Sequence, residues 1–506
     1  MASSFYSPEL LRSIAEQNTW LTLLPEIGLA VLALLVLLLE VSGTQRQRLI
    51  PGVAIVGQGI VLLGVVALII WQPFADGEAF AGMLQHSLTG NLMRLFFLIS
   101  SIGISLLALA YLRQRGLSLC VFYHLLLVIM VGLMLLAQSA HFVMLFVALE
   151  LVTVGFYVLV GYCRGSGLSL EAGLKYLILG GCSSAILLAG VVLLYGVASN
   201  PNLPEAIGNP LAFSALQGFI SAHSNHPLVL IGAALTIAGI AFKIGVVPFQ
   251  IWIPDVYQGA PTPVTALLAV SSKAGGIFVL LNLVLGVFAP LSAMVVPLLS
   301  AMAVGGILFG NLAAMSQRNV KRLMGLSGIA HAGYLLVGVI AAMSLPWAVW
   351  AVFFYLLTYL LASFAVFGVM LILAPEEDAW QELFDYRNLG KDYPFLGGVL
   401  AIGLGSLAGI PPLGGFIGKV LIFYAAFQAG LYSLLAVSLI GVVLSVVYYF
   451  DWLLMAFSSN HPFPSSQGQG PSLDLKVHPL QRAVMVCLAG ATILLGLYPG
   501  VFYLLG

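Results

Sequence analysis

Two lysines in a long apolar stretch are the residues of this sequence with the most telling chemistry. Lys243 and Lys273 lie in segment 241–275, where a polar bend at 255–262 separates two apolar helical runs and Pro248 interrupts the first run. A lysine at membrane depth costs roughly 2.5–3.5 kcal/mol on insertion scales, so it usually marks a path for ions or protons. A proline-broken helix frees backbone groups that must face protein or water. This pairing favours a membrane protein that moves protons or ions.

Further ionisable residues lie in other apolar runs. Glu150 lies in the middle of an apolar helix, and Lys419 follows a second break at Pro411 and Pro412. An unpaired carboxylate at this depth would have to be protonated, so we expect Glu150 to pair with a lysine on a neighbouring helix. Lys175, one span later, is the nearest candidate. Because it lies near the end of its helix, its side chain could instead extend to the interface.

A single histidine, His331, lies inside the apolar segment SGIAHAGYLL. With Lys273 it is placed to connect the two halves of the chain, and its ordinary pKa near 6.5 suits a proton relay. The alternative is a hydrogen-bonded packing residue. Burial disfavours a charged ammonium and a nearby carboxylate favours it. A lysine whose counter-charge approaches and withdraws can therefore take up and release a proton.

The composition identifies a polytopic membrane protein. Of 506 residues, 61% are hydrophobic and only 7% are charged, against about 25% charged in soluble domains. The formal net charge is zero, so we expect lipids as surroundings and no nucleic acid as a partner.

Several cofactor signatures are missing. The four cysteines form no CxxC pair, which argues against a haem, an iron–sulfur cluster or a zinc site. The sequence has neither a Walker A motif nor a GxGxxG between a strand and a helix, so we expect it to bind neither ATP nor NADH. We therefore predict no metal or cofactor site in this chain.

Apolar runs of about 20 residues, long enough to cross a bilayer, occur fourteen times. We read the two longest as discontinuous helices, because they contain Pro248 and the GIPPLGG run. The runs lie near 20–42, 51–72, 91–112, 118–137, 141–162, 171–196, 227–252, 260–289, 292–315, 322–343, 346–374, 393–428, 430–456 and 480–505.

The distribution of lysine and arginine gives an orientation. With both termini outside, twelve of the eighteen basic residues lie at cytoplasmic loops or helix ends, and only Arg12 and Arg94 lie outside. Such an excess of basic residues is typical of cytoplasmic loops. An acidic group also falls on the cytoplasmic side, either as a solvated loop or as a contact for a partner: Glu376, Glu377, Asp378, Glu382 and Asp385. Asp451 and Glu26 are expected to be satisfied acids near the interface.

A weak internal symmetry divides the chain. Residues 118–289 and 292–456 each hold five spans, and the fourth span of each is broken by proline. Blocks with an odd number of spans enter the membrane from opposite sides, as in transporters with inverted repeats. Residues 1–117 add three spans, and residues 457–506 form a loop and a last span. The expected fold is thus an all-α membrane protein with about 14 transmembrane helices and two inverted five-helix repeats.

Four motifs resemble one family. FKIGVVPFQIWIPDVYQGAPTPVTALLAVSSKA at 242–274 is similar to the seventh and eighth helices of the antiporter-like subunits of respiratory complex I. Its DVYQGAPTPV bend looks like that of the N type, called subunit 2 in organelles. EAGLKYLILGGCSSAILLAG at 171–190, NVKRLMGLSGIAHAGYLLVG at 319–338 and LAGIPPLGGFIGK at 407–419 agree. The resemblance covers about residues 20–505.

The resemblance implies a function, a set of sites and partners. It implies a proton-translocating, non-redox subunit of NADH-quinone oxidoreductase, with Glu150 and Lys175 as an ion pair, Lys243 as the central lysine, Lys273 and His331 as the connecting relay and Lys419 on the exit side. K-type and M-type subunits would flank the chain, and the lateral helix of the L-type subunit would lie along it. FMN, iron–sulfur clusters and quinone would be handled by other subunits.

Two other functions stay open on the sequence alone. One is a free-standing, Mrp-like cation/proton antiporter subunit, which needs no electron-transfer partner. The other is a structural membrane scaffold, in which replacing Glu150 or Lys243 would leave turnover unchanged. The expected location is the bacterial inner membrane, with an organellar membrane as the alternative.

Overall fold

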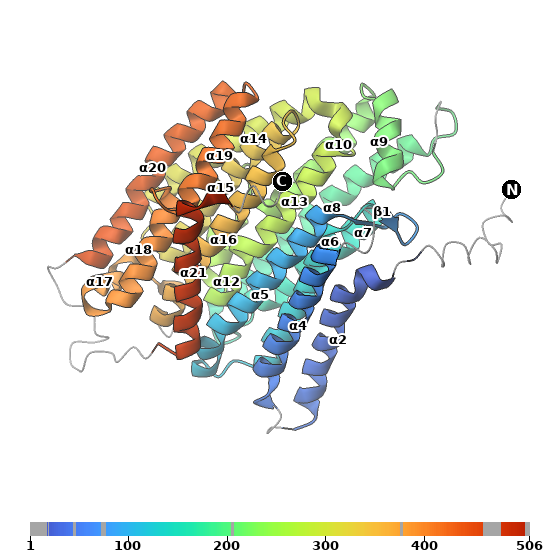
Figure 1. The fold of residues 1–506 in the computed structure, drawn as a ribbon. Helices are drawn as coiled ribbons and strands as arrows, with labels where there is room; N and C mark the ends of the chain where they lie inside the picture. The colour runs from blue at the N-terminus through green and yellow to red at the C-terminus, as the bar shows by residue number, and fades with distance from the viewer. Residues whose placement is uncertain are drawn as a thin grey trace.

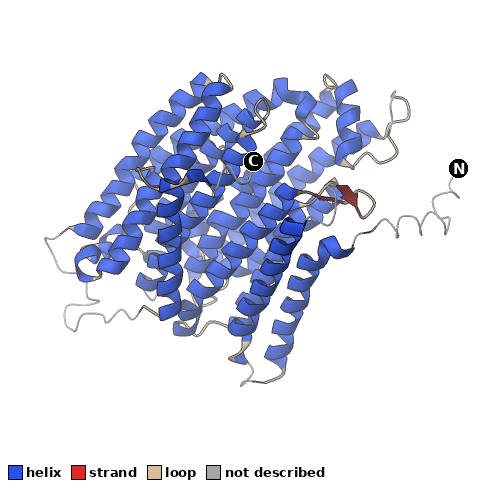
Figure 2. Cartoon of the chain, in the orientation of Figure 1, coloured by secondary structure: helices blue, strands red, loops and turns tan. Residues whose placement is uncertain are grey.

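The computed structural model describes residue 18 and residues 20–43, 47–71, 77–203, 207–374, 378–458 and 477–500. Within these ranges the chain is almost entirely helical, apart from one two-stranded antiparallel sheet (Figure 2). Residues 459–476 and 501–506, in the predicted loop and last span, lie outside the described residues, as do Arg12, Glu376 and Glu377.

The helices lie side by side in a bundle (Figure 1). In chain order the elements are η1 (Trp20–Leu23), α2 (Leu24–Val41), α4 (Ile50–Trp71), β1 (Gly77–Ala79), β2 (Leu84–His86), α5 (Leu88–Gln114), α6 (Leu119–Ala137), α7 (Phe142–Val160), α8 (Gly167–Ala198), α9 (Phe213–Ala222), α10 (Pro227–Ile244), α11 (Trp252–Gly259), α12 (Thr262–Leu267), η2 (Leu268–Ser272), α13 (Lys273–Leu285), η3 (Ala289–Leu291), α14 (Ser292–Met315), α15 (Val320–Ala342), α16 (Ala348–Leu373), η4 (Asp378–Trp380), η5 (Leu383–Tyr386), α17 (Leu389–Asp392), α18 (Pro394–Ala408), α19 (Gly414–Gln428), α20 (Tyr432–Phe457) and α21 (Pro479–Leu497).

The expected all-α membrane fold is confirmed. Among the described residues, 13 helical segments are long and apolar enough to cross a membrane. Helices α18 and α19 have 15 residues each, which gives each a length of about 22 Å at ~1.5 Å per residue. Each is too short to cross alone, so together they make one further crossing as a discontinuous helix.

The two helix breaks have the same local design. Helices α10 and α18 end at Gly245 and Gly409, whose φ angles are 78° and 86°. Glycine adopts this left-handed conformation without strain and so ends a helix cleanly. A proline with a cis peptide bond, Pro248 or Pro412, stands three residues after each glycine. Each broken helix therefore ends at a defined residue, α10 at Gly245 and α18 at Gly409.

The most buried helices are the continuous segment α12–η2–α13 and α15. In both, the most apolar 18-residue window is entirely buried inside the protein. The η2 turn is a π-helix, a local widening that is frequent at functional sites. Because these two helices carry Lys273 and His331, both side chains are placed at the centre of the bundle.

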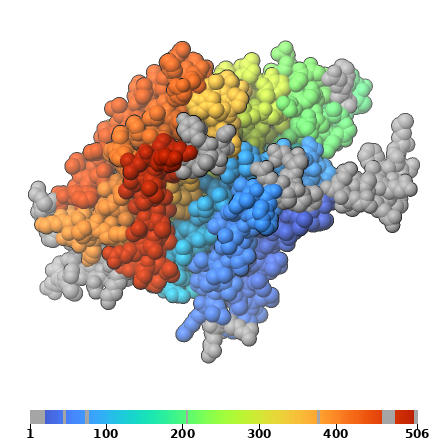
Figure 3. All heavy atoms as spheres, in the orientation of Figure 1, coloured from blue at the N-terminus to red at the C-terminus, as the bar shows by residue number. Residues whose placement is uncertain are grey.

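The first and last helices close the bundle on one side. In the space-filling view the red C-terminal helix α21 lies on the surface between the blue N-terminal helices and the orange second block (Figure 3). Its Gln481 Nε2 donates to the Leu107 carbonyl of α5 at 2.9 Å. Helix α2 is tied to α5 by Glu26, whose carboxylate accepts from Arg94 Nε at 2.7 Å. Arg94 is therefore fully buried rather than simply external, and Glu26 is satisfied as expected.

A buried acid, Asp378, links the loop after α16 to the centre of the bundle. Asp378 accepts hydrogen bonds from Tyr111 Oη at 2.6 Å and from the backbone and side chain of Thr262 at 2.7 Å each. Lys321 Nζ lies 3.4 Å from its carboxylate. Asp378 is thus neither solvated nor free for a partner. Burial raises the pKa of Asp378, but the Lys321 ammonium lowers it, and the net result is a pKa below the ordinary value.

We predict that Asp378→Asn destabilises the folded chain, because it leaves Lys321 buried without a counter-charge. Breaking such a pair costs about 3–5 kcal/mol, which thermal unfolding in detergent would detect. Asp451→Asn, at an exposed carboxylate, is the matched control. Because the folded pKa of Asp378 is depressed, the wild-type advantage should be present above the ordinary carboxyl pKa and lost as the pH falls through the folded value. Equal stability of the two variants would contradict the assignment.

Candidate functional site

Lys243 lies in the last turn of helix α10 and is buried, with 7% of its surface exposed. Its Nζ donates to Thr153 Oγ1 at 2.6 Å. Thr153 lies one turn after Glu150 on α7, and the charge of Glu150 acts on Lys243. Among the described salt bridges none joins these two residues directly. The Glu150 carboxylate is therefore a nearby counter-charge that makes no direct ion pair with Lys243.

A small cavity extends from Lys243 towards the π-helical turn. It has a volume of about 20 Å³ and is lined by Thr153, Lys243 and Ser272 among apolar side chains. A space of this size holds about one water molecule. Ser272 directly precedes Lys273, so the cavity connects the surroundings of the first lysine to the helix of the second.

Lys273 is held by oxygen atoms of the second block. Its Nζ donates to the Gly328 carbonyl at 2.5 Å and to Tyr359 Oη at 3.3 Å. A Cβ atom at Gly328 would lie 2.7 Å from this Nζ. The absence of a side chain at position 328 thus makes room for the ammonium group between α13, α15 and α16.

His331 lies on α15 between two tyrosine hydroxyls. Its Nδ1 is 2.8 Å from Tyr355 Oη, and its Nε2 is 3.2 Å from Tyr449 Oη. The ring also packs against that of Tyr359, with 5.0 Å between centroids. Both Lys273 and Lys419 are near enough for their charges to act on His331. Hydrogen bonding on both nitrogens makes His331 a well-packed residue that can also pass a proton.

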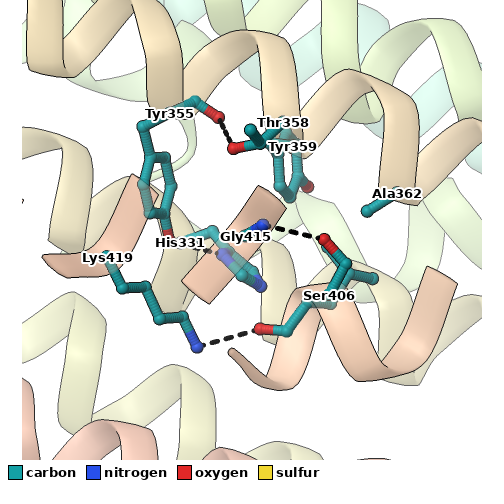
Figure 4. A pocket seen from close by; sticks show the side chains of 9 residues that line it. His331, Tyr355, Thr358, Tyr359, Ala362, Ser406, Gly415 and Lys419 are labelled. Carbon is teal, nitrogen blue, oxygen red and sulfur yellow. Dashed lines mark hydrogen bonds between the residues drawn. The ribbon is translucent and has the colours of Figure 1, made fainter. Parts of the chain in front are cut away.

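Lys419 lies on α19 and reaches back across the second break. Its Nζ donates to the Leu407 and Ala408 carbonyls, at 2.9 Å each. These are free carbonyls at the end of α18, where a cation is favoured by the helix dipole. Figure 4 shows Lys419 and His331 on the wall of one small cavity of about 10 Å³, with Tyr355, Thr358, Tyr359 and Ser406 around it.

The expected ion pair between Glu150 and Lys175 is not formed. Ser184 donates to the Glu150 carboxylate, whereas Lys175 pairs with Glu171 and Asp255 at 2.7 Å each and is 41% exposed.

The reason is the register of α7 against α8. Gly161 lies against Gly173, and Tyr157 lies against Gly180. Lys175 is therefore level with the end of α7, about 15 Å along the helix axis from Glu150. There it belongs to a half-exposed charge network. Burial raises the pKa of Asp255, but hydrogen bonds from Lys175 and Arg322 outweigh burial and lower it.

Sequence analysis missed the neutral partners of the buried charges. Thr153, Tyr359, Tyr355 and Tyr449 supply the hydroxyls that hold Lys243, Lys273 and His331. Hydroxyl residues in apolar helices are also ordinary packing groups, so single positions gave no signal. The high density of tyrosine around 355–359 and 448–449 is the one pattern that could have pointed to them.

Titratable and hydroxyl side chains gather at the centre of the bundle. Among the described residues no group of three His, Cys, Asp or Glu side chains could hold a metal ion. What the centre of the bundle does contain is three buried lysines and a histidine, spaced by hydroxyls and small cavities. Each of these groups can accept and donate a proton.

Comparisons with known proteins place this arrangement in a family. Residues 139–445 match the family described as NADH:quinone oxidoreductase/Mrp antiporter, transmembrane. The chain is 53% identical over 494 residues to NADH-quinone oxidoreductase subunit N 1 of Opitutus terrae, covering 97% of this chain and 98% of the relative.

Solved structures agree with this match. A chain of respiratory complex I from Thermus thermophilus superposes with a TM-score of 0.77 at 30% identity, covering 94% of this chain and 98% of that one. A chain of the Mrp complex from Dietzia has a TM-score of 0.80 at 21% identity, covering 96% of each chain. This second likeness shows the fold alone.

We predict that thiol labelling separates the two lysine environments. In a background without Cys163, Cys182 and Cys487, a cysteine replacing Lys175 should react severalfold faster with a water-soluble maleimide than a cysteine replacing Lys243. The reason is the 41% exposed side chain of Lys175 against the buried Lys243. A cysteine replacing Lys391, exposed in the short helix α17, gives the upper reference rate. Equally slow labelling at 175 and 243 would instead favour a buried Lys175.

Proposed function

We propose that this chain, which belongs to the family of NADH-quinone oxidoreductase subunit N, carries protons through the membrane arm of that complex by way of its buried lysines and histidine. The chain itself is a multi-pass membrane subunit of an enzyme complex. Its own part, in this proposal, is proton transfer without redox chemistry, coupled to quinone reduction in other subunits.

One observation carries the proposal: the buried titratable groups form a row that crosses both blocks. Lys243 and Ser272 line the same small cavity, and Ser272 directly precedes Lys273. Tyr359 accepts a hydrogen bond from Lys273 and packs against the ring of His331, so it connects these two residues. A second small cavity connects His331 with Lys419. A structural scaffold has no need for three lysines in an apolar interior, where each is costly.

The row can work by electrostatic coupling between neighbours. Among the described residues Lys273, Lys419 and His331 have no carboxylate in a salt bridge. Protonation of one therefore disfavours protonation of the next, because like charges repel. Glu150 differs, since its negative charge favours a proton on Lys243. Movement of Glu150 towards or away from Lys243 would then load or release that lysine and pass the effect along the row.

Lys175 takes a place at the edge of this row. Its exposed network with Glu171 and Asp255 lies about 15 Å along α8 from the level of Glu150. We propose that it collects protons on the cytoplasmic side of the first block. In this proposal Lys175 belongs to the proton path without a direct ion pair to Glu150.

The remaining assignments follow from the same proposal. K-type and M-type subunits flank the chain, the lateral helix of an L-type subunit lies along it, and FMN, iron–sulfur clusters and quinone are bound elsewhere in the complex. The chain lies in a bacterial inner membrane with both termini outside. The Mrp-like alternative draws support only from the shared fold, whereas the 53% identical relative is a subunit N.

We predict that Lys243→Arg and Lys419→Arg each lower proton pumping and quinone reduction about tenfold or more, a barrier increase of ~1.4 kcal/mol. Arginine keeps the positive charge but does not give up its proton in proteins. Pumping is measured with a pH-sensitive dye in proteoliposomes of the purified complex. Lys391→Arg, exposed in the short helix α17, is the control. Full activity of both buried variants would overturn the proton-transfer role.

Gly328→Ala should uncouple Lys273 from its oxygen partners. The new Cβ would lie 2.7 Å from Lys273 Nζ and 3.2 Å from Tyr359 Oη, so the flexible lysine must move while the helix keeps its place. We expect normal assembly of the complex and severalfold slower pumping. Gly181→Ala, where a Cβ meets nothing within 4 Å, is the matched control. Unchanged pumping in Gly328→Ala would show that the Lys273 contacts are dispensable.

A further inference from the structure

A set of neutral polar side chains lies beside His331, and the proposed row of lysines does not use their hydroxyls to pass protons. Tyr448 and Tyr449 lie on α20, Asn311 on α14 and Tyr334 on α15, and each is at most 2% exposed. The three helices lie side by side (Figure 1) and contact one another. Burying four polar groups at one place needs an explanation, because each must find a partner in the apolar interior.

The polar groups connect in one direction, away from His331. Tyr449 Oη is 3.2 Å from His331 Nε2. The ring of Tyr449 packs against that of Tyr448, with 4.5 Å between the ring centroids. Tyr448 Oη in turn donates to Asn311 Oδ1 at 3.0 Å. The chain of contacts therefore runs from the histidine to α14.

The orientation of the Asn311 amide follows from its other bond. Asn311 Nδ2 donates to the Ile307 carbonyl at 2.7 Å, and a carbonyl only accepts. Oδ1 must therefore face Tyr448, whose hydroxyl must donate. In this conformation the Tyr448 proton is turned towards Asn311, and the lone pairs of the hydroxyl stay available to accept.

An open cavity lies one helical turn beyond this pair. Asp451 is three residues after Tyr448, and Met315 is four residues after Asn311. Both line a cavity of about 840 Å³, together with Arg318, Glu382 and Leu454. The residues on its wall belong to the side that the charge distribution predicts to be cytoplasmic. A cavity of this volume holds many water molecules.

We infer that this cavity and the Tyr448–Tyr449 pair form a proton uptake route from the cytoplasmic water to His331. The inference rests on the proposed proton-transfer function. It adds a second uptake point, in the second block, to the one at Lys175. On the wall of the cavity Asp451 and Glu382 outnumber the single basic residue, Arg318, and the net negative charge favours protons there over anions.

Protons pass along hydroxyls without ionising them. Tyr448 accepts a proton from water in the cavity and gives its own to Tyr449, and Tyr449 gives its own to His331 Nε2. The histidine gains one proton, the cavity loses one, and each hydroxyl ends with one. Turning the Tyr448 hydroxyl from Asn311 to Tyr449 is the step that opens the route. Asn311 is thus a positioning residue that holds the route closed at rest.

The first test removes one hydroxyl. Tyr448→Phe keeps the ring and its packing but removes the relay atom. In the purified complex we expect severalfold slower pumping and quinone reduction, a larger solvent deuterium isotope effect because proton uptake becomes limiting, and unchanged thermal stability. Tyr432→Phe, at an exposed position of the same helix, should change neither rate nor isotope effect. Wild-type rate and isotope effect in Tyr448→Phe would overturn the route.

The second test blocks the cavity itself. In a background without Cys163, Cys182 and Cys487, Leu454→Cys is treated with a charged, membrane-impermeant thiol reagent in inside-out vesicles that contain the complex. Pumping should fall severalfold, and the same reagent from the other face should have no effect. Leu480→Cys, exposed in the first turn of α21 and outside the lining of the cavity, is the control. Undiminished pumping after complete modification at position 454 would contradict the route.

The experiments distinguish failure of the uptake route from failure of the proposed function. If Lys243→Arg and Lys419→Arg abolish pumping while Tyr448→Phe and the modified Leu454→Cys do not, the uptake route is wrong and the proposed function stands. If both arginine variants pump normally, the proposed function is wrong, and the uptake route with it.

Discussion

An ammonium group inside a membrane protein must be surrounded by oxygen atoms, and the arrangement of this bundle follows from how it supplies them. Four lysines are buried: Lys243, Lys273, Lys321 and Lys419. Lys321 alone has a carboxylate within salt-bridge distance. The other three depend on hydroxyls and backbone carbonyls, which solvate an ammonium without fixing its charge. Lys321 is therefore suited to a permanent structural charge, and Lys243, Lys273 and Lys419 are suited to a change of protonation state.

The helix breaks are the main source of these oxygens in the second block. Ending α18 at Gly409 frees the Leu407 and Ala408 carbonyls, and Lys419 binds both. The first block uses its break differently. Lys243 lies before Gly245, so it reaches a side chain, Thr153, instead of the freed carbonyls. The two halves share a backbone design but solvate their lysines by different atoms.

Much of the fold could be predicted from the sequence, because it depends on strong local signals. Apolar runs, glycine and proline at the breaks and the basic loops gave the crossings and the discontinuous helices. Asp378 was misjudged and the burial of Arg94 was missed, since charge counting assumes that loop and end residues meet water. Each instead found a buried partner distant in the sequence, Glu26 or Lys321.

The site was predictable only in part. Ionisable residues in apolar runs stand out, so the sequence alone named six candidate positions, whose role in proton transfer stays a prediction. Their partners depend on helix register, which no local pattern gives. The pair Glu150–Lys175 failed for this reason, because packing of Gly161 on Gly173 sets Lys175 near the end of α7. The π-helical turn before Lys273 could not be predicted either, because the residue types of 268–272 give no signal for it.

The register has a consequence for how the halves are coupled. Glu150 is the one carboxylate whose charge acts on Lys243, and a single hydroxyl, Ser184, holds it. A carboxylate bound by few donors moves more readily than one bound like Asp378, which has four hydrogen bonds and a lysine. The same protein therefore contains one acid fixed as a structural anchor and one held loosely beside the row. Movement in response to a neighbouring subunit is expected at Glu150, where α7 presents its exposed face, and not at Asp378.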